Sequence, residues 1–343
     1  MTKSNLKNNK LGAFIVPTGI GASIGGYAGD ASTWARRFSK ECTLLVNPNV
    51  VNAGGFSGIT PNMLYVEGYS LDEFFKGNIN LLPSENNKIG VIFDKGISDE
   101  VLNIHINTIN AVKTVYDIDI IYEITPEEIE VEFFVDTSGI STGKVKNIEK
   151  LLITAKNLLK NGAEAIAVVC KFEDDNQNTN YENGIGVDPI GGVEAIISHY
   201  LSKELKVPTA HSPAFEDFSI STKIVNPKAS SEYITPTFLP CILLGLQNAP
   251  QISKNGEMER GKKSAQFKAH SSQLTVSDLD FLVMPYDSLG STPVFEAIKR
   301  GLKIFAIKEN KTVLSVTKDV LMLDGVIEVG TYQECLDLIK RTI

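Results

Sequence analysis

Short apolar runs alternate along the chain with stretches in which apolar residues recur every three or four positions. Three segments share one order: an apolar run, a turn rich in small residues, an amphipathic stretch and a second apolar run. They cover residues 12–47, 131–170 and 279–309, and the turn of the middle segment is expected at 137–146. Apolar strands that alternate with amphipathic helices predict parallel sheets covered by helices.

The whole pattern predicts an α/β fold of mainly parallel sheets flanked by helices, built from Rossmann-like βα units as two lobes around a cleft. We expect residues 1–10 to be a disordered tail, 11–130 to form a first lobe and 131–343 to form the second. Residues 49–70 are expected to be a long loop. Residues 246–272 are expected to be either a lid or a surface loop.

The charge balance is mildly acidic, because 33 Lys and Arg stand against 41 Asp and Glu, which gives a net charge of −8. No basic cluster stands out, so we expect neither nucleic acid nor a membrane as a partner. No apolar run reaches the roughly 18–20 residues that span a bilayer, and the polar start MTKSNLKNNK lacks a signal-peptide core. We therefore expect a cytoplasmic protein, and homo-oligomer formation stays open.

The cysteines lie far apart and form no CxxC pair, which favours reduced thiols in the core over a zinc or iron–sulfur site. Paired thiols of the racemase type are an alternative. The sequence does not identify a cofactor. The cysteines are Cys42, Cys170, Cys241 and Cys335.

The stretch VPTGIGASIGGYAGD, residues 16–30, places five glycines between an apolar run and a predicted helix. Glycine backbone before a helix N-terminus allows close approach of a phosphate or carboxylate, so we expect an anion-binding loop. The spacing is not G-x-G-x-x-G, and no Walker lysine follows. The alternative is a tight turn that lets helix and strand pack closely. The loop residues expected to bind the anion are Thr18, Gly19, Gly21, Ser23 and Gly25.

A second turn of small residues, 288–292, precedes a predicted helix with Pro293 in its first turn. It resembles the phosphate-binding turn of nucleotide-sugar glycosyltransferases over a short stretch. Ligands of parallel sheets sit beyond the carboxyl ends of the strands, so both turns are expected to face one cleft. The further residues expected to bind an anionic small-molecule ligand are Ser288, Gly290, Ser291, Thr292, Lys144, Glu309 and Asn310.

His211, in VPTAHSPAFED, follows a predicted strand and is the candidate general acid or base, because an imidazole titrates near neutral pH. Asp188 or Asp136 is expected to orient the imidazole or to bind a metal. The alternative for Asp188 is a cap on the helix that carries Glu194.

These features predict a cytoplasmic enzyme of small-molecule metabolism that acts on a phosphate- or carboxylate-bearing substrate. The reaction class stays open among lyase, isomerase, hydrolase and group transfer. One alternative is a non-catalytic ligand-binding or regulatory protein that uses the same turns. Another is a cyclic-amide-type hydrolase, in which Ser138 or Ser141 is the nucleophile and Lys144 its base.

Several motifs together resemble one family of unknown function, DUF3326, of bacteria, cyanobacteria and plants. They are VPTGIGASIGGYAGD, NPNVVNAG, PNMLYVEGYSLDEF, GVDPIGGVEAIISH, PTAHSPA and KENKTVLSV. The resemblance spans roughly residues 11–340, so it implies one full-length unit. It implies no activity, cofactor or site residue.

Overall fold

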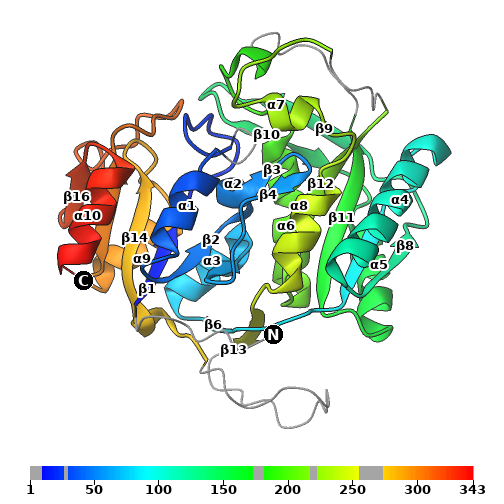
Figure 1. Ribbon diagram of the computed structural model, residues 1–343, viewed down its shortest axis with the longest axis horizontal. Coiled ribbons are helices and arrows are strands. Elements are labelled where there is room, and N and C mark those ends of the chain that lie inside the picture. The colour runs from blue at the N-terminus through cyan, green and yellow to red at the C-terminus, as the bar shows by residue number, and fades with distance from the viewer. Residues whose placement is uncertain (1–9, 27–29, 173–180, 217–221, 255–272, 343) are drawn as a thin grey trace.

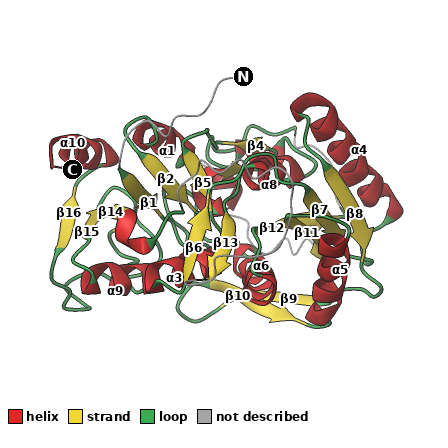
Figure 2. Cartoon of the chain, turned by 90° about the horizontal axis from the view of Figure 1, so that it is seen from below, coloured by secondary structure: helices red, strands yellow, loops and turns green. Residues whose placement is uncertain are grey.

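The computed structural model describes residues 10–26, 30–172, 181–216, 222–254 and 273–342. Two parallel sheets stand side by side, and helices cover both faces of each sheet (Figure 1, Figure 2). The predicted α/β class with mainly parallel sheets is confirmed. Among the described helices, none has the length and apolar character needed to cross a membrane.

Two predictions lie largely outside the described residues. The tail expected at 1–10 is described only at Lys10. Of the stretch 246–272, residues 246–254 are described and contain the end of a helix and a short strand, whereas 255–272 lie outside the described residues.

The helices are α1 (Ser32–Phe38), α2 (Pro48–Val51), α3 (Gly68–Lys76), α4 (Asp99–Tyr116), α5 (Ile148–Lys160), α6 (Gly191–Leu205), α7 (Ser230–Tyr233), α8 (Leu239–Gln247), α9 (Thr292–Lys299) and α10 (Tyr332–Thr342). Short antiparallel pairs are β3 (Asn52–Ala53) with β4 (Phe56–Ser57), β6 (Ile79–Leu82) with β13 (Gln251–Lys254), and β9 (Val131–Val135) with β10 (Ser141–Val145).

The first sheet has the order β16-β15-β14-β1-β2-β5, and all neighbouring strands are parallel. Its strands are apolar at consecutive positions because both faces are buried. Phe14 packs against Phe38 of α1 and Tyr332 of α10, whereas Ala13 belongs to the core under α3 and α9. The strands are β1 (Leu11–Phe14), β2 (Thr43–Val46), β5 (Met63–Tyr65), β14 (Leu279–Pro285), β15 (Lys303–Ile307) and β16 (Val326–Val329).

The second sheet has the order β12-β11-β7-β8 and is also parallel. One face packs on α4 and α8, and the other on α5 and α6. The apolar cluster beneath α4 and α8 continues into the cluster beneath α1 and α10 of the first sheet, so the two lobes share one core. The strands are β7 (Ile89–Phe93), β8 (Ile120–Ile124), β11 (Ala165–Phe172) and β12 (Thr209–Phe215).

The two sheets do not divide the chain at residue 130. Strands β7 and β8 precede this residue but pair in the second sheet, and β14 to β16 follow it but pair in the first. The second sheet is therefore an insertion between β5 and β14. Periodicity identifies strands and helices, but it contains no information on which distant strands pair.

Two expected loops contain regular structure. Residues 137–146, expected to be a turn before a helix, include β10, which pairs antiparallel with β9. Residues 49–70 include most of α2, the β3–β4 pair and β5, the edge strand of the first sheet. These strands are short or polar, so they lack the apolar run that would predict them.

Helix α6 meets the β9–β10 hairpin at a contact that requires glycine. A side chain at Gly192 would collide with the backbone carbonyl of Ser141. The Ser141 hydroxyl accepts the N–H of Gly192 at 3.0 Å and donates to the carbonyl of Pro189 at 2.6 Å. The hairpin therefore lies directly on the first turn of α6.

We expect Gly192→Ala to lower the free energy of unfolding by roughly 1–3 kcal/mol, because the backbone of β10 has to move away from α6. Lys203→Ala, at an exposed position of the same helix, is the control and should change stability by less than about 0.5 kcal/mol. Urea denaturation measures both variants. Equal stability of the two would show that the contact can relax.

An ion pair joins α3 of the first lobe to α6 of the second. His199 Nε2 lies 2.9 Å from Glu67 Oε1, and the other Glu67 oxygen caps α3 by accepting the N–H groups of Tyr69 and Ser70. Burial by itself lowers the pKa of His199. The hydrogen bond to Glu67 and the charges of Glu67 and Asp72 outweigh burial, so the pKa lies above 6.5 overall.

A histidine whose pKa is raised on folding stabilises the fold fully below its unfolded pKa, and this contribution disappears as the pH rises through the folded value. We therefore expect the stability difference between the protein and His199→Gln to shrink from about pH 6 to about pH 9. Urea denaturation at several pH values measures this difference. A difference that grows with pH would contradict the role given to the ion pair.

Candidate functional site

A pocket of about 90 Å³ lies where the two lobes meet. A water molecule occupies about 30 Å³ in the liquid, so the pocket has room for a small polar group. Its walls come from the loop after β1, from α2 and β3, from β12, and from the residues around α6, α7 and α8. The lining residues are Thr18, Gly26, Pro48, Asn49, Asn52, Gly54, Asp188, Ile190, Gly191, Glu194, His211, Pro213, Glu232, Phe238, Cys241 and Ile242.

A wider hollow of about 400 Å³ lies beside Asp94, at the carboxyl ends of β7 and β8. The Asp94 oxygens already accept the backbone N–H groups of Gly96, Ile129 and Lys171. This carboxylate holds the loops of the second sheet together, so we place the candidate site in the smaller pocket.

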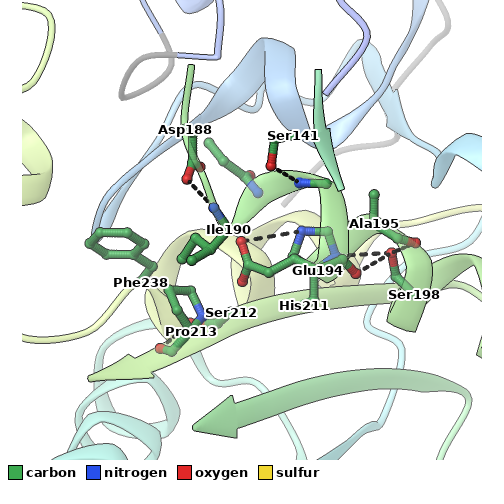
Figure 3. Close-up of polar contacts among 12 residues, drawn as sticks. Ser141, Asp188, Ile190, Glu194, Ala195, Ser198, His211, Ser212, Pro213 and Phe238 are labelled. Carbon is green, nitrogen blue, oxygen red and sulfur yellow. Dashed lines mark hydrogen bonds and ion pairs between the residues drawn. The ribbon is translucent and has the colours of Figure 1, made fainter. Parts of the chain in front are cut away.

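His211 lies within β12, not after a strand as expected, and it lines the pocket (Figure 3). Its Nδ1 is 2.9 Å from the Ser198 hydroxyl. That hydroxyl has one proton, which it donates to the backbone carbonyl of Glu194 or Ala195. Nδ1 therefore donates to Ser198, and Nε2 keeps its lone pair.

The imidazole of His211 is uncharged at neutral pH. Burial lowers the pKa of His211 to about 3, and the charge of His199 contributes in the same direction. The free Nε2 faces the Glu194 carboxyl at 3.9 Å. His211 therefore presents an unprotonated nitrogen to the pocket.

Glu194 supplies the partner that the sequence analysis did not assign to the site. It lies in the first turn of α6 and is 6% exposed. Its Oε1 is buried and has no hydrogen-bond partner among the described residues. Burial raises the pKa of Glu194 well above its ordinary value, and the charges of Asp188 and Glu232 raise it further. Burial thus favours the protonated form of Glu194 and the unprotonated form of His211, the forms in which a carboxyl can donate a proton and an imidazole can accept one.

Asp188 lines the pocket and also orders the start of α6. Its Oδ1 accepts the N–H of Ile190 at 3.0 Å. Burial raises the pKa of Asp188, and hydrogen bonds from the N–H groups of Ile190 and Gly191 offset only part of that rise. Asp188 therefore both lines the pocket, as the sequence predicts for a site residue, and caps the start of α6, as the alternative predicts.

The glycine-rich loop contributes Thr18 and Gly26 to the pocket wall. Gly19, Gly21 and Gly25 each have positive φ and pack closely against neighbouring residues, as the tight-turn alternative requires. For example, a side chain on Gly21 would press on the carbonyl of Gly186.

Four consecutive N–H groups of this loop already have protein acceptors. Ser23 donates to the carbonyl of Lys311, Ile24 to the Asn310 side chain, Gly25 to the Asp30 carboxylate and Gly26 to the carbonyl of Asn49. These groups hold the loop in place. They are therefore not available to an anion in this structure.

Glu309 and Asn310 lie beneath the loop and do not line the pocket. The Ser23 hydroxyl donates to the carbonyl of Glu309 at 3.2 Å. Asn310 is fully buried and donates to the carbonyl of Ile24 and to the hydroxyl of Tyr332. They position the loop.

The second small-residue turn also lies away from the pocket. Residues 288–292, which include Ser288, Gly290, Ser291 and Thr292, connect β14 to α9, and none lines it. The Ser288 hydroxyl donates to the carbonyl of Pro285 at 3.3 Å. The two predicted anion turns therefore do not converge on this pocket.

Asp136 and Lys144 lie on the exposed part of the β9–β10 hairpin and do not line the pocket. Asp136 accepts the N–H groups of Ser138 and Ile140 and the Ser138 hydroxyl. Lys144 pairs with Glu132 at 3.7 Å. Asp136 thus forms the turn, which explains why a carboxylate follows this strand.

The described structure does not bring the predicted Ser–Lys pair together. Ser141 and Lys144 are three residues apart in β10, so their side chains point to opposite faces. Ser138 bonds to Asp136 in the turn. This arrangement gives neither serine a lysine base.

The cysteines are buried and free, as expected, and only Cys241 lines the pocket among the described residues. Its Sγ donates to the carbonyl of Phe238 at 3.1 Å, and burial raises the pKa of Cys241 to about 12. A thiol in this state is not a nucleophile at neutral pH. The described residues also contain no group of three or more His, Cys, Asp or Glu side chains placed to hold a metal ion.

The sequence contained one signal for Glu194. Glu194, Ile197 and Leu201 follow helical spacing, so the carboxyl lies on the same face as two core residues. An acidic residue on an apolar face is rarely buried without a partner or a function. No comparable signal marks Asn52, Glu232 or Phe238, which the fold brings from separate elements.

Comparison with known proteins gives a family but no activity. The family described as "Protein of unknown function (DUF3326)" matches residues 12–342. An uncharacterized lipoprotein of a Synechococcus species is 36% identical over 307 residues, which cover 88% of this chain and 82% of the relative. No solved structure matches the chain. The relative's name describes a lipoprotein, whereas the sequence predicts a cytoplasmic protein, and the location stays a prediction.

We expect His211 to remain uncharged, with its proton on Nδ1, across the range from about pH 5 to about pH 9. The reason is its burial, together with the hydrogen bond to Ser198. Nitrogen-15 NMR of histidine side chains measures this, and His211→Gln assigns the signal. A midpoint near pH 6.5 would mean that water reaches the ring freely.

Proposed function

The chain belongs to the DUF3326 family, and we propose that it is an enzyme that transfers protons to and from a small substrate bound between the two lobes. One observation carries the proposal. The unprotonated Nε2 of His211 lies 3.9 Å from Oε2 of Glu194, whose Oε1 has no hydrogen-bond partner among the described residues, in a pocket with room for a small group.

The pair can move two protons in one reaction. His211 Nε2 accepts a proton from one substrate atom, and the Glu194 carboxyl donates its proton to another. The pair starts uncharged and ends as imidazolium and carboxylate, so each product charge stabilises the other in the buried site. This supports an isomerisation, or an elimination or addition, in which one substrate atom loses a proton and another gains one.

Ser198 acts on the reaction through His211. Its hydroxyl accepts a hydrogen bond from the Nδ1–H group of His211, which keeps the reactive lone pair on Nε2. Asp188 fixes the start of α6 and so positions Glu194, which lies one turn further along the helix. Both are positioning residues in this proposal.

We infer that the substrate does not bind through an anionic group at residues 23–26. Their N–H groups are bonded within the protein from Ser23 to Gly26. The described lining of the pocket also contains no lysine or arginine. The wider expectation of an anion-binding loop at residues 16–30 stays a prediction.

We expect the protein to consume at least one compound in a bacterial small-molecule extract, and His211→Asn or Glu194→Gln to lower its turnover by about 10²-fold or more. Asparagine and glutamine keep the size of the side chain but not the proton transfer. Mass spectrometry of the extract before and after incubation measures turnover. Glu296→Gln, on the surface of α9, is the matched control and should leave it unchanged.

Native mass spectrometry of the purified protein distinguishes the non-catalytic alternative. A compound that co-purifies and is never consumed would favour a ligand-binding protein. Turnover that persists in both site variants would place the reaction elsewhere in the molecule.

A further inference from the structure

We propose that the substrate carries a protonated amine and that the pocket recognises this positive charge through carboxylates and an aromatic ring. The inference names the substrate class of the proposed enzyme, and so it rests on that proposed function. The ammonium group is a binding handle beside the proton-transferring pair.

The charged side chains around the pocket favour a positive ligand. Three carboxyl side chains line it from separate parts of the chain: Asp188 before α6, Glu194 within α6 and Glu232 in α7. No lysine or arginine is among the described lining residues. Because Glu194 carries its proton in the proposed enzyme, a negative group would be repelled by the carboxylates of Asp188 and Glu232, whereas a positive group is attracted to both.

Two buried oxygens of the pocket wall lack hydrogen bonds and favour a ligand that donates them. Glu194 Oε1 and Asn52 Oδ1 have no partner among the described residues, although both atoms are buried. The Asn52 amide nitrogen is already bonded to the Tyr65 hydroxyl at 3.1 Å. Buried oxygens without donors are costly, and a ligand rich in N–H groups satisfies them.

The apolar part of the pocket wall favours an organic cation over a metal ion. The lining includes the ring of Phe238 together with Ile190 and Pro213, which are apolar. Metal ions of biological sites require several polar ligands, and the described residues contain no group of three placed to hold one. An ammonium group on a carbon chain fits both parts of this wall, because aromatic rings attract organic cations.

The arrangement leaves the reactive pair free. In Figure 3, the Glu194 carboxyl lies between His211 on one side and Asp188 and Phe238 on the other. An ammonium group on the side of Asp188 and Phe238 places the attached carbon chain next to Glu194 and His211. The ammonium group of the substrate would thus lie next to the substrate atoms that exchange protons with Glu194 and His211.

The test compares small probes of different charge on the full-length protein at neutral pH. The probes are methylammonium, acetate, inorganic phosphate, methanol and magnesium chloride, each titrated to millimolar concentrations. The readout is the nitrogen-15 and carbon-13 NMR signal of the His211 ring, assigned with His211→Gln. Glu232→Gln keeps an oxygen for the Tyr181 hydroxyl but removes the charge, and Glu296→Gln on the surface is its control.

We expect methylammonium alone to shift the His211 signal to saturation, and Glu232→Gln to weaken this binding by about tenfold while Glu296→Gln leaves it unchanged. A response to acetate or phosphate, to magnesium alone, or to none of the probes would overturn the inference. If Glu232→Gln does not fold, the comparison of probes on the unaltered protein decides. The same spectra report the protonation of the ring. A charged His211 would overturn the proposed function. A neutral His211 that responds to a probe other than methylammonium would overturn only the inference that the substrate is an amine.

Discussion

Helix α6 is enclosed on several sides, and the candidate site depends on this enclosure. It packs against β10, β12, α3 and α5, so even its polar positions are removed from water. Ser198, Ser202 and Glu194 are all buried on this one helix. Burial raises the pKa of the Glu194 carboxyl and lowers the pKa of the His211 imidazole next to it. The chemistry of the pocket therefore follows from the packing of a single helix between two lobes.

The close contact at Gly192 sets the position of that helix. Because no side chain intervenes, the Ser141 hydroxyl reaches both the N–H of Gly192 and the carbonyl of Pro189. The N–H of Ser141 in turn donates to the carbonyl of Gly19 in the loop after β1. One serine thus connects the hairpin, the start of α6 and the glycine-rich loop. At Gly19, this contact leaves little room for a side chain, which explains the glycine at that position.

The α/β class was predictable because each strand and helix buries an apolar stripe that is visible in the local sequence. His211 was predicted because it follows an apolar run, and Asp188 because it precedes the helix that carries Glu194; both line the pocket. Asp136 was predicted because it ends an apolar run, and Lys144 because it is the nearest cation, but the two strands beside them form a hairpin and not a βα unit. Glu194 was not assigned to the site because the helix that carries it is enclosed partly by α3 and β10, which are distant in sequence. Local patterns identify elements, whereas the site is made by contacts between them.

The position of β1 has a consequence for the order in which the protein is assembled. This strand is the first described strand of the chain, and it lies between β2 and β14 in the middle of its sheet. During synthesis, β2 is made soon after β1, but β14 follows only after the whole second sheet has left the ribosome. Until then, one side of β1 is an open edge with unpaired backbone groups. The second sheet has all its strands by residue 215, so this middle part of the chain can pair its strands first, and the first sheet, which begins the chain, is completed last.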